Sequence, residues 1–273
     1  MTWNLWWRFG PWEEREAAII AVIAAEQPDV VLLQEVWSHG PDSSAARIAD
    51  ALGYHAVLSD DAFPSAAGEP ERIGFHNAIL SRWPLADECS VALVNSLGAP
   101  GHRRLVAAQM QSPWGAWPVL STHLDYRFDE SELRQAQAAE LLAFVAEYRG
   151  DADTALPMIV GGDFNAVPDS DEIRLLTGRR AGAPRNLVLS DAWEQVGDGP
   201  GFTWRDDNPY QTITAWPRRR LDYVFVSWPR PKPVGNPVAA HLAGIDDRYG
   251  VVPSDHAAVV VELVTPDSAG SRG

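Results

Sequence analysis

The chain has 273 residues, of which 46% are hydrophobic and 22% charged; this composition is that of a globular protein and excludes a disordered one. The net charge of −15 disfavours tight, nonspecific binding to a polyanion. An acidic site that holds a divalent cation would still accept a phosphate ester, because the metal supplies local positive charge. The single cysteine, Cys89, excludes an internal disulfide and suits a reducing compartment.

The sequence shows neither a membrane span nor a signal peptide. No stretch approaches the roughly 20 apolar residues that a helix needs to cross a bilayer. The first residues, MTWNLWW, lack the basic start and the apolar segment of a signal peptide. We therefore expect a cytoplasmic protein with no integral membrane segment, and we expect it to be a monomer.

The hydrophobic pattern predicts helices and strands that alternate early in the chain, followed by a part in which strands dominate. Pro28 ends the first helix, Asp129 or Ser131 can cap the longest helix, and Gly178 stops the next one. In chain order we expect an aromatic strand around Asn4, a helix at 13–27, a strand at 29–35, a helix at 43–52, strands at 54–59, 75–81, 104–111 and 117–123, a helix at 129–148, a strand at 157–161, a helix at 170–177, and strands at 221–227 and 257–263.

This order of elements predicts an α/β (α+β) fold with sheets in the middle and helices outside. No repeat is visible, and no long linker divides the chain. We therefore expect a single domain at residues 1–265. The last residues, 266–273, are expected to form a flexible tail.

Polar side chains recur at the ends of the predicted strands. A carboxylate near the core is costly when nothing compensates its charge, so their repetition suggests one shared site. In the stretch GGDFN, the two glycines are expected to let the backbone turn sharply and approach a neighbour closely. The residues in question are Asn4, Glu35, His123, Asp163, Asn165, Asp222, Asp255 and His256.

These residue types together indicate a chemistry. Carboxylate and amide oxygens suit Mg²⁺ or Mn²⁺. Imidazole can take or give a proton near neutral pH. A hard cation beside carboxylates and a pair of histidines is typical of phosphate ester hydrolysis, in which one group activates water and another stabilises the leaving oxygen.

Seven short motifs carry a resemblance to a known family. In order they are TWNLWW, DVVLLQEVW, HNAILSRWP, STHLD, GGDFNAVPDS, RRLDYVFVS and PSDHAAVVVEL. Together they resemble the endonuclease/exonuclease/phosphatase superfamily, which includes deoxyribonuclease I, abasic-site endonucleases, neutral sphingomyelinases and inositol polyphosphate 5-phosphatases. The resemblance runs from residue 2 to about 264. It implies a four-layer α/β/β/α sandwich of two packed, mostly antiparallel sheets, with the site at one end.

The resemblance also implies roles for individual residues. Glu35 would be the main metal ligand, with Asn4 beside it and Asp255 as a second metal-side carboxylate. Asp163 would orient or deprotonate the attacking water, and Asn165 would hold a phosphate oxygen.

On the leaving-group side, His256 would bind the phosphate and transfer a proton, polarised by Asp222. His123 would stand near the leaving group, as in the deoxyribonuclease-like branch. The abasic-site branch usually has a tyrosine there, so His123 argues against that activity.

Each of these residues also has a purely structural interpretation. Asp163 and Asn165 could form a turn, Asn4 could satisfy a buried hydrogen bond, and Asp222 could pair with Arg220. The ordered set of motifs favours the functional interpretation. For Arg103–Arg104 and for the stretch Arg218–Arg219–Arg220 a solvated loop flank is favoured over contact with phosphate. Trp204, Trp216 and Trp228 are expected in loops near Asp222, where a tryptophan can face the substrate.

We therefore expect a Mg²⁺- or Mn²⁺-dependent hydrolase of phosphate esters that acts by in-line attack of water. The alternative is a non-catalytic member of the same fold that acts as a binding protein. The substrate class stays open among nucleic acid, nucleotide and phospholipid head group. The absence of a dense basic run slightly favours a small or single-stranded phosphoester. The loops at about 59–74, 96–103 and 203–219 should decide between these substrates.

Overall fold

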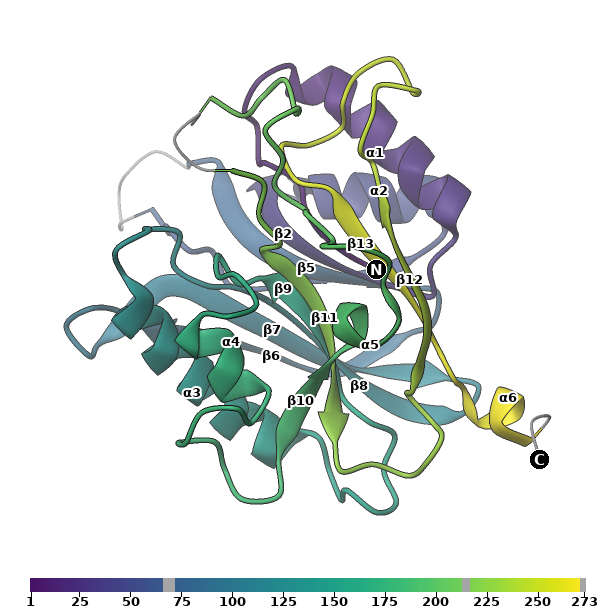
Figure 1. Ribbon diagram of the computed structural model, residues 1–273. Coiled ribbons are helices and arrows are strands. Elements are labelled where there is room, and N and C mark those ends of the chain that lie inside the picture. The colour runs from purple at the N-terminus through teal and green to yellow at the C-terminus, as the bar shows by residue number, and fades with distance from the viewer. Residues whose placement is uncertain (66–71, 213–216, 271–273) are drawn as a thin grey trace.

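A computed structural model describes residues 1–65, 72–212 and 217–270 and has four layers (Figure 1). Two β-sheets pack face to face in the middle. Helices α1 and α2 cover one outer face, and α3 and α4 cover the opposite face. The helices are α1 (Trp12–Glu26), α2 (Ser44–Leu52), α3 (Ser131–Tyr148), α4 (Asp171–Leu176), α5 (Ala192–Val196) and α6 (Pro266–Gly270).

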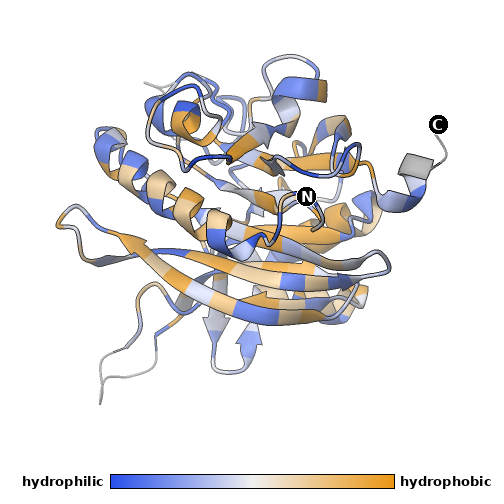
Figure 2. Cartoon of the chain, turned by 90° about the horizontal axis from the view of Figure 1, so that it is seen from below, coloured by the Kyte–Doolittle hydropathy of each residue, from blue (hydrophilic) through white to orange (hydrophobic). Residues whose placement is uncertain are grey.

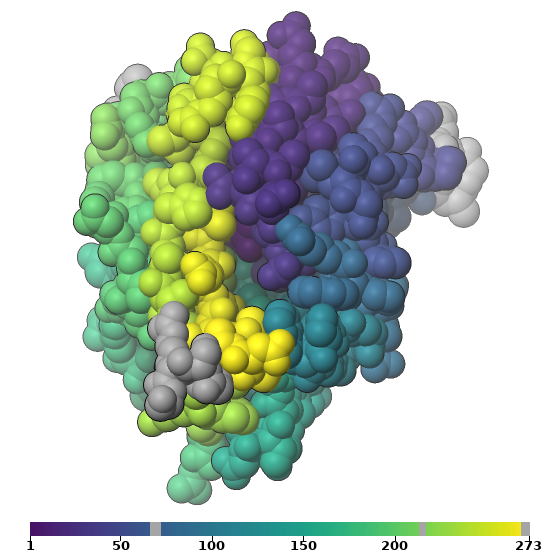
Figure 3. All heavy atoms as spheres, turned by 90° about the vertical axis from the view of Figure 1, so that its right-hand side faces the viewer, coloured from purple at the N-terminus to yellow at the C-terminus, as the bar shows by residue number. Residues whose placement is uncertain are grey.

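The first sheet joins the two ends of the chain. Strand β1 pairs in parallel with β2 and antiparallel with β13, so the N-terminal segment lies beside the C-terminal strands (Figure 3). The strand order is β12 (Pro237–Ala243), β13 (Ala258–Leu263), β1 (Thr2–Asn4), β2 (Val30–His39), β5 (Gly74–Ser81) and β4 (His55–Leu58), with β3 (Asp42–Ser43) paired to β2.

The second sheet is also mixed. Strands β8 and β9 run parallel, and the other neighbouring pairs are antiparallel. The strand order is β10 (Val188–Asp191), β11 (Asp222–Trp228), β9 (Ile159–Asp163), β8 (Gly115–His123), β7 (Pro100–Ser112) and β6 (Leu85–Val94). The expected four-layer sandwich of two packed sheets is therefore confirmed.

Both faces of the central strands are buried, which explains their continuous apolar runs. In β2, Leu32 packs between the two sheets, while Leu33 packs against α1 and α2. In β11, Val224 packs between the sheets, while Phe225 faces the layer of α3 and α4. Figure 2 shows the same distribution, with hydrophobic residues concentrated on the strands.

Several predicted elements differ from the structure. Strands β3, β6, β10 and β12 and helix α5 were not predicted from the sequence. Helix α3 begins without a side-chain cap, so the expected capping by Asp129 or Ser131 is wrong; the Ser131 hydroxyl donates instead to Glu172 at 2.8 Å. Residues 266–270 of the expected tail form α6, and its residue Asp267 accepts a hydrogen bond from Trp114 at 2.7 Å. None of the helices in the described part of the chain is long and apolar enough to cross a membrane.

Candidate active site

Strand register brings the polar strand ends together. In the second sheet, Asp163 at the end of β9 lies opposite Asp222 of β11 on one side and opposite His123 of β8 on the other. From the first sheet, Asn4 at the end of β1 donates its side-chain amide to the Asp163 carboxylate at 3.0 Å. Asn4 and Asp222, which are 218 positions apart in the chain, therefore both lie next to Asp163 at one edge of the two sheets.

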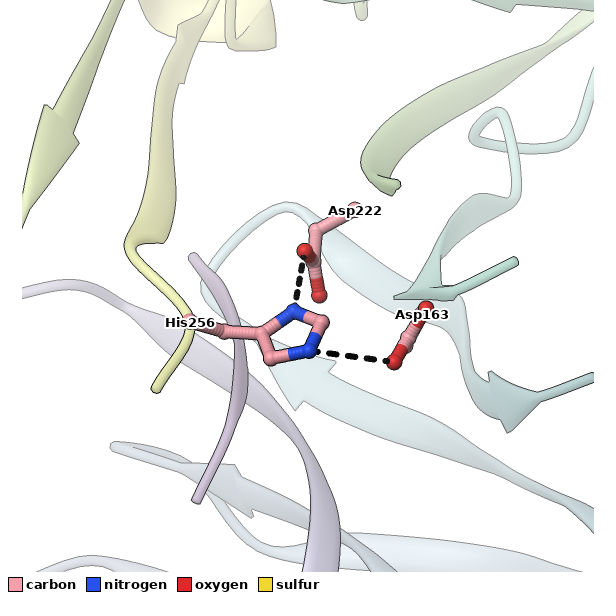
Figure 4. Close-up of side chains that lie close together, drawn as sticks. All are labelled: Asp163, Asp222 and His256. Atoms are coloured by element: carbon pink, nitrogen blue, oxygen red, sulfur yellow. Dashed lines mark hydrogen bonds and ion pairs between the residues drawn. The ribbon is translucent and has the colours of Figure 1, made fainter. Parts of the chain in front are cut away.

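His256 stands between two of these carboxylates (Figure 4). Its Nδ1 lies 2.8 Å from Asp222 Oδ2, and its Nε2 lies 3.8 Å from Asp163 Oδ2. Burial opposes a charge on the ring, but Asp222, Asp163 and Asp255 outweigh burial and raise the pKa of His256 well above its ordinary value. These carboxylates therefore favour a proton on each ring nitrogen, and a proton on Nε2 could be donated.

Two carboxylates of the site, those of Glu35 and Asp255, accept few hydrogen bonds. Glu35 accepts one bond from Asn4 at 3.3 Å, and Asp255 accepts one from Ser254 at 3.4 Å. Burial and the repulsion from Asp255 raise the pKa of Glu35 to about 7. Burial also raises the pKa of Asp255. The protein therefore compensates only part of the negative charge of Glu35 and Asp255.

The backbone at Glu35 is unusual. Its φ is +54°, a left-handed conformation that a non-glycine residue seldom adopts. The pairing of β2 with β5 shifts between Leu33 and Val36, so Glu35 lies in a β-bulge. Bulges re-aim a side chain and are common beside active sites. Here the bulge turns the Glu35 carboxylate towards the cavity that it lines.

The two glycines before Asp163 allow close approach but do not make the turn. A Cβ on Gly161 would lie 2.6 Å from Leu32 Cδ1, and a Cβ on Gly162 would lie 2.2 Å from the Thr122 carbonyl oxygen. Both glycines belong to β9, so the expected sharp turn at the glycines is wrong. The left-handed residue is Asn165, with a φ of +50°.

Asn165 closes the turn that follows β9. Its backbone N–H donates to Asp163 Oδ1 at 2.9 Å, and its side-chain amide donates to the Leu124 carbonyl at 3.1 Å. Asp163 and Asn165 therefore do form a turn, as their structural interpretation expects, and both side chains also line the cavity. Burial, together with the neighbouring Asp222, raises the pKa of Asp163 to about 6.

His123 has a partner that its sequence motif does not predict. Arg103 Nη1 lies 3.0 Å from His123 Nδ1, and His123 Nε2 lies 3.5 Å from Asp163 Oδ2. Burial and the Arg103 charge lower the pKa of His123 well below its ordinary value, so the ring is neutral. Arg103 lines the cavity, which corrects its interpretation as a solvated flank. The missed signal was its position in β7, beside the strand that ends at His123.

A second arginine, Arg15 of α1, holds the loops around the site. Its buried guanidinium donates to backbone carbonyls on both sides: to Leu5 at 2.8 Å and to Pro253 at 2.9 Å. It also donates to the carbonyls of Trp6, Trp7 and Phe9. The loop after β1 and the loop that carries Asp255 and His256 are therefore fastened to one side chain.

Other sequence interpretations are corrected by their contacts. Arg220 is buried and pairs with Asp191 at 2.7 Å, so it neither pairs with Asp222 nor belongs to a solvated flank. Of the three loop tryptophans, Trp204 lines the cavity, whereas Trp228 lies at the far end of β11 beside Arg230. Trp216 lies outside the described residues, as do parts of two loops expected to select the substrate.

Two groups of residues are candidates for holding a metal ion. Asp163, Asp222 and His256 offer ligand atoms within 4.8 Å of one another, which among the described residues is the one such cluster of acids, histidines and cysteines. Both ring nitrogens of His256 already face carboxylate oxygens, Asp222 at 2.8 Å and Asp163 at 3.8 Å, so this cluster is better suited to hydrogen bonding. The carboxylate oxygens of Glu35 and Asp255 fit a hard cation better, because their negative charge is under-compensated. Asn4 lies beside them and turns its amide NH2 group towards Glu35 and Asp163, while its oxygen accepts from the Trp6 N–H at 2.9 Å.

A cavity of about 1030 Å³ opens over these groups. Aromatic side chains supply much of its wall, and several are unusually exposed: Tyr126 is 64% and Phe63 is 47% exposed. The aromatic residues of the wall are Trp6, Phe9, Phe63, Phe75, Tyr126, Phe128, Trp204 and Tyr210. The cavity can therefore receive a substrate with flat or apolar groups around a phosphate.

Comparisons with known proteins agree with the fold. The model of the Endonuclease/Exonuclease/phosphatase family matches residues 1–256. Nocturnin of Rattus norvegicus is 26% identical over 227 residues, which cover 79% of this chain and 49% of nocturnin. The chain thus spans about half the length of the curated relatives it matches.

Two solved structures have a similar fold. D. rerio TDP2, complexed with single strand DNA product, superposes with a TM-score of 0.74 at 22% identity, with 97% of each chain covered. The human nocturnin catalytic domain, with bound sulfate anion, has a TM-score of 0.71 at 22% identity, with 96% of this chain and 93% of that chain covered.

Proposed function

Because this chain belongs to the Endonuclease/Exonuclease/phosphatase family, a family of phosphoester hydrolases, we propose that it hydrolyses phosphate esters with a bound Mg²⁺ or Mn²⁺. One observation carries the proposal. Glu35, the pair Asp163 and Asn165, Asp222, and His256 come from four separate segments of the chain, and their side chains gather at one edge of the two sheets under one cavity.

Glu35 and Asp255 would hold the metal, with Asn4 beside them. Carboxylate oxygens are the hard ligands that Mg²⁺ and Mn²⁺ prefer, and no cationic side chain of the described residues lies within hydrogen-bond distance of either carboxylate. When bound, such an ion offsets the charge that develops on the phosphoryl oxygens. The raised pKa of Glu35 supports this assignment, since it reflects negative charge that the protein leaves uncompensated.

Asp163 is proposed to orient the attacking water and accept its proton. Asn4 and the backbone of Asn165 each donate to it, which fixes the carboxylate in one orientation. A pKa of about 6 suits a general base that works near neutral pH. The Asn165 amide keeps a second hydrogen beyond the one donated to Leu124, and it is proposed to hold a phosphate oxygen.

His256 is proposed to bind the phosphoryl group and to donate a proton to it or to the leaving oxygen. Asp222 accepts from Nδ1 and so aims Nε2 towards the cavity. This resembles the role of a buried aspartate that orients a catalytic histidine and stabilises its charged form.

The cavity supports a small or single-stranded phosphoester as the substrate. Among the residues that line it, Arg103 and Arg127 are the arginines, and Arg127 is paired with Asp125 at 3.0 Å. A substrate with many phosphates would find few cations there, whereas aromatic rings offer stacking surfaces for bases. The neighbours bound to single strand DNA product and to sulfate are compatible with this choice. The cytoplasmic location and the monomeric state stay predictions.

Hydrolysis of bis-p-nitrophenyl phosphate tests the reaction. We expect turnover with Mn²⁺ or Mg²⁺, no turnover in EDTA, and recovery when the metal is restored. Metal-independent turnover would rule out the proposed reaction, and no turnover under any metal would favour a binding protein of the same fold. A panel of oligonucleotides, nucleotides, phosphoinositides and sphingomyelin, assayed with the metal present, then selects the substrate class.

A further inference from the structure

We infer that Arg103 is a positioning residue that fixes which nitrogen of His123 carries the proton, so that the ring presents Nε2–H to the phosphoryl group as a hydrogen-bond donor. This inference rests on the proposed function for its catalytic consequence. The protonation pattern itself follows from two contacts of the His123 ring and can be measured without metal or substrate.

The first contact is between Arg103 Nη1 and His123 Nδ1, at 3.0 Å. A guanidinium has only donors and keeps its charge, so it cannot accept a hydrogen bond from the ring. Nδ1 must therefore be the acceptor and must carry a lone pair. In a neutral imidazole with a bare Nδ1, the single proton is on Nε2.

The second contact shows where that proton points. His123 Nε2 lies 3.5 Å from Asp163 Oδ2, too far for a good hydrogen bond. His123 is only 3% exposed and lines the cavity beside Asp163 and His256. Its Nε2–H is therefore a buried donor with a long, weak contact, aimed at the place where the phosphoryl group is proposed to bind.

Arg103 is itself held in position. The carboxylates of Glu35, Asp163 and Asp125 attract its charge, and its guanidinium lies 5.5 Å from the ring centroid of Tyr126. The Arg103 charge also opposes a second proton on His123. The two histidines of the site thus have different tasks: His256 carries the transferable proton, and His123 supplies a fixed neutral donor.

The ring nitrogens of His123 can be observed directly. A long-range ¹H–¹⁵N spectrum of the metal-free protein at pH 7.5 should show His123 as the Nε2–H tautomer. In Arg103→Leu that spectrum should change to a mixture of tautomers or to a protonated ring. Arg103→Gln keeps a neutral donor and should retain the Nε2–H form, while Arg104→Leu alters the neighbouring arginine, which does not line the cavity, and should change nothing.

Activity supplies the second measurement. On bis-p-nitrophenyl phosphate with Mn²⁺, Arg103→Leu should lower kcat about 10²-fold, the usual effect of losing one transition-state donor. In a His123→Ala background the same substitution should have little further effect, because Arg103 acts through the ring. An Nδ1–H tautomer in the parent protein, an unchanged spectrum in Arg103→Leu, or additive losses in the double variant would each overturn the inference. If no variant or parent turns over substrate, the proposed function fails while the tautomer result still stands.

Discussion

Replacing Glu35 by glutamine should stabilise the metal-free protein at alkaline pH. The pKa of Glu35 is raised from 4.5 to about 7 by burial and by Asp255. Between these two values the folded state keeps the Glu35 proton while the unfolded state releases it. The unfolded state then binds fewer protons, so the free energy of unfolding falls as pH rises through this window. Above about pH 7 the full destabilisation is present.

The magnitude follows from the same two pKa values. Each tenfold change in proton affinity corresponds to about 1.4 kcal/mol, so a pKa of about 7 in place of 4.5 sets a ceiling of about 3 kcal/mol. The Glu35 side chain lines an open cavity, and water there screens part of the cost. We therefore expect Glu35→Gln to raise the free energy of unfolding by about 1–3 kcal/mol at pH 8.

Urea unfolding in EDTA at pH 5 and pH 8 measures this effect. At pH 5 the folded parent protein already has a neutral Glu35, so Glu35→Gln should change its stability little. Glu88→Gln, at an exposed position of β6, is the matched control and should be nearly neutral at both pH values. A Glu35→Gln variant that is no more stable than the parent at pH 8 would refute the reasoning, because Glu35 would then carry no electrostatic cost.

Three further predictions concern residues that position the site. Asp222→Asn should lower kcat on bis-p-nitrophenyl phosphate by about 10²–10⁴-fold, because His256 loses its orienting anion; thermal unfolding shows whether the fold survives, and a near-parental rate would contradict this role. Gly162→Ala should lower the free energy of unfolding, measured in urea, by about 1–3 kcal/mol, because the added Cβ would lie 2.2 Å from a carbonyl oxygen. The control is Gly98→Ala, whose Cβ would meet nothing within 4 Å and whose only cost is the strain of an alanine at a φ of +73°. Equal losses of stability in the two variants would contradict this reasoning. Arg15→Met should lower the free energy of unfolding by about 3–5 kcal/mol, and Arg15→Lys should recover little of this loss, because a compact ammonium cannot donate to carbonyls on both loops at once. Full stability in the lysine variant would show that the charge alone matters.

The sequence was most informative where the signal was local. The apolar runs of β2, β9 and β11 identify buried strands, because both faces of these strands are covered. Strand β6, by contrast, has only one buried residue, Leu93, and strand β12 alternates at half-exposed positions; both lie at or near sheet edges. Few side chains of these two strands are buried, so their hydrophobic pattern is weak and does not identify them from the sequence.

For the candidate site, too, the sequence determined some features and the tertiary structure determined others. The sequence by itself determined which polar residues stand at the ends of strands, because a motif such as GGDFN is a property of neighbouring positions. Only the tertiary structure decided their partners: that Arg220 pairs with Asp191, that Arg103 faces His123, and that a bulge turns Glu35 towards the cavity. These contacts depend on strand register and on the packing of two sheets. A shift of one residue in register would turn the same side chains to the opposite face. Because both faces of these central strands are buried, their continuous apolar runs do not distinguish one register from the other.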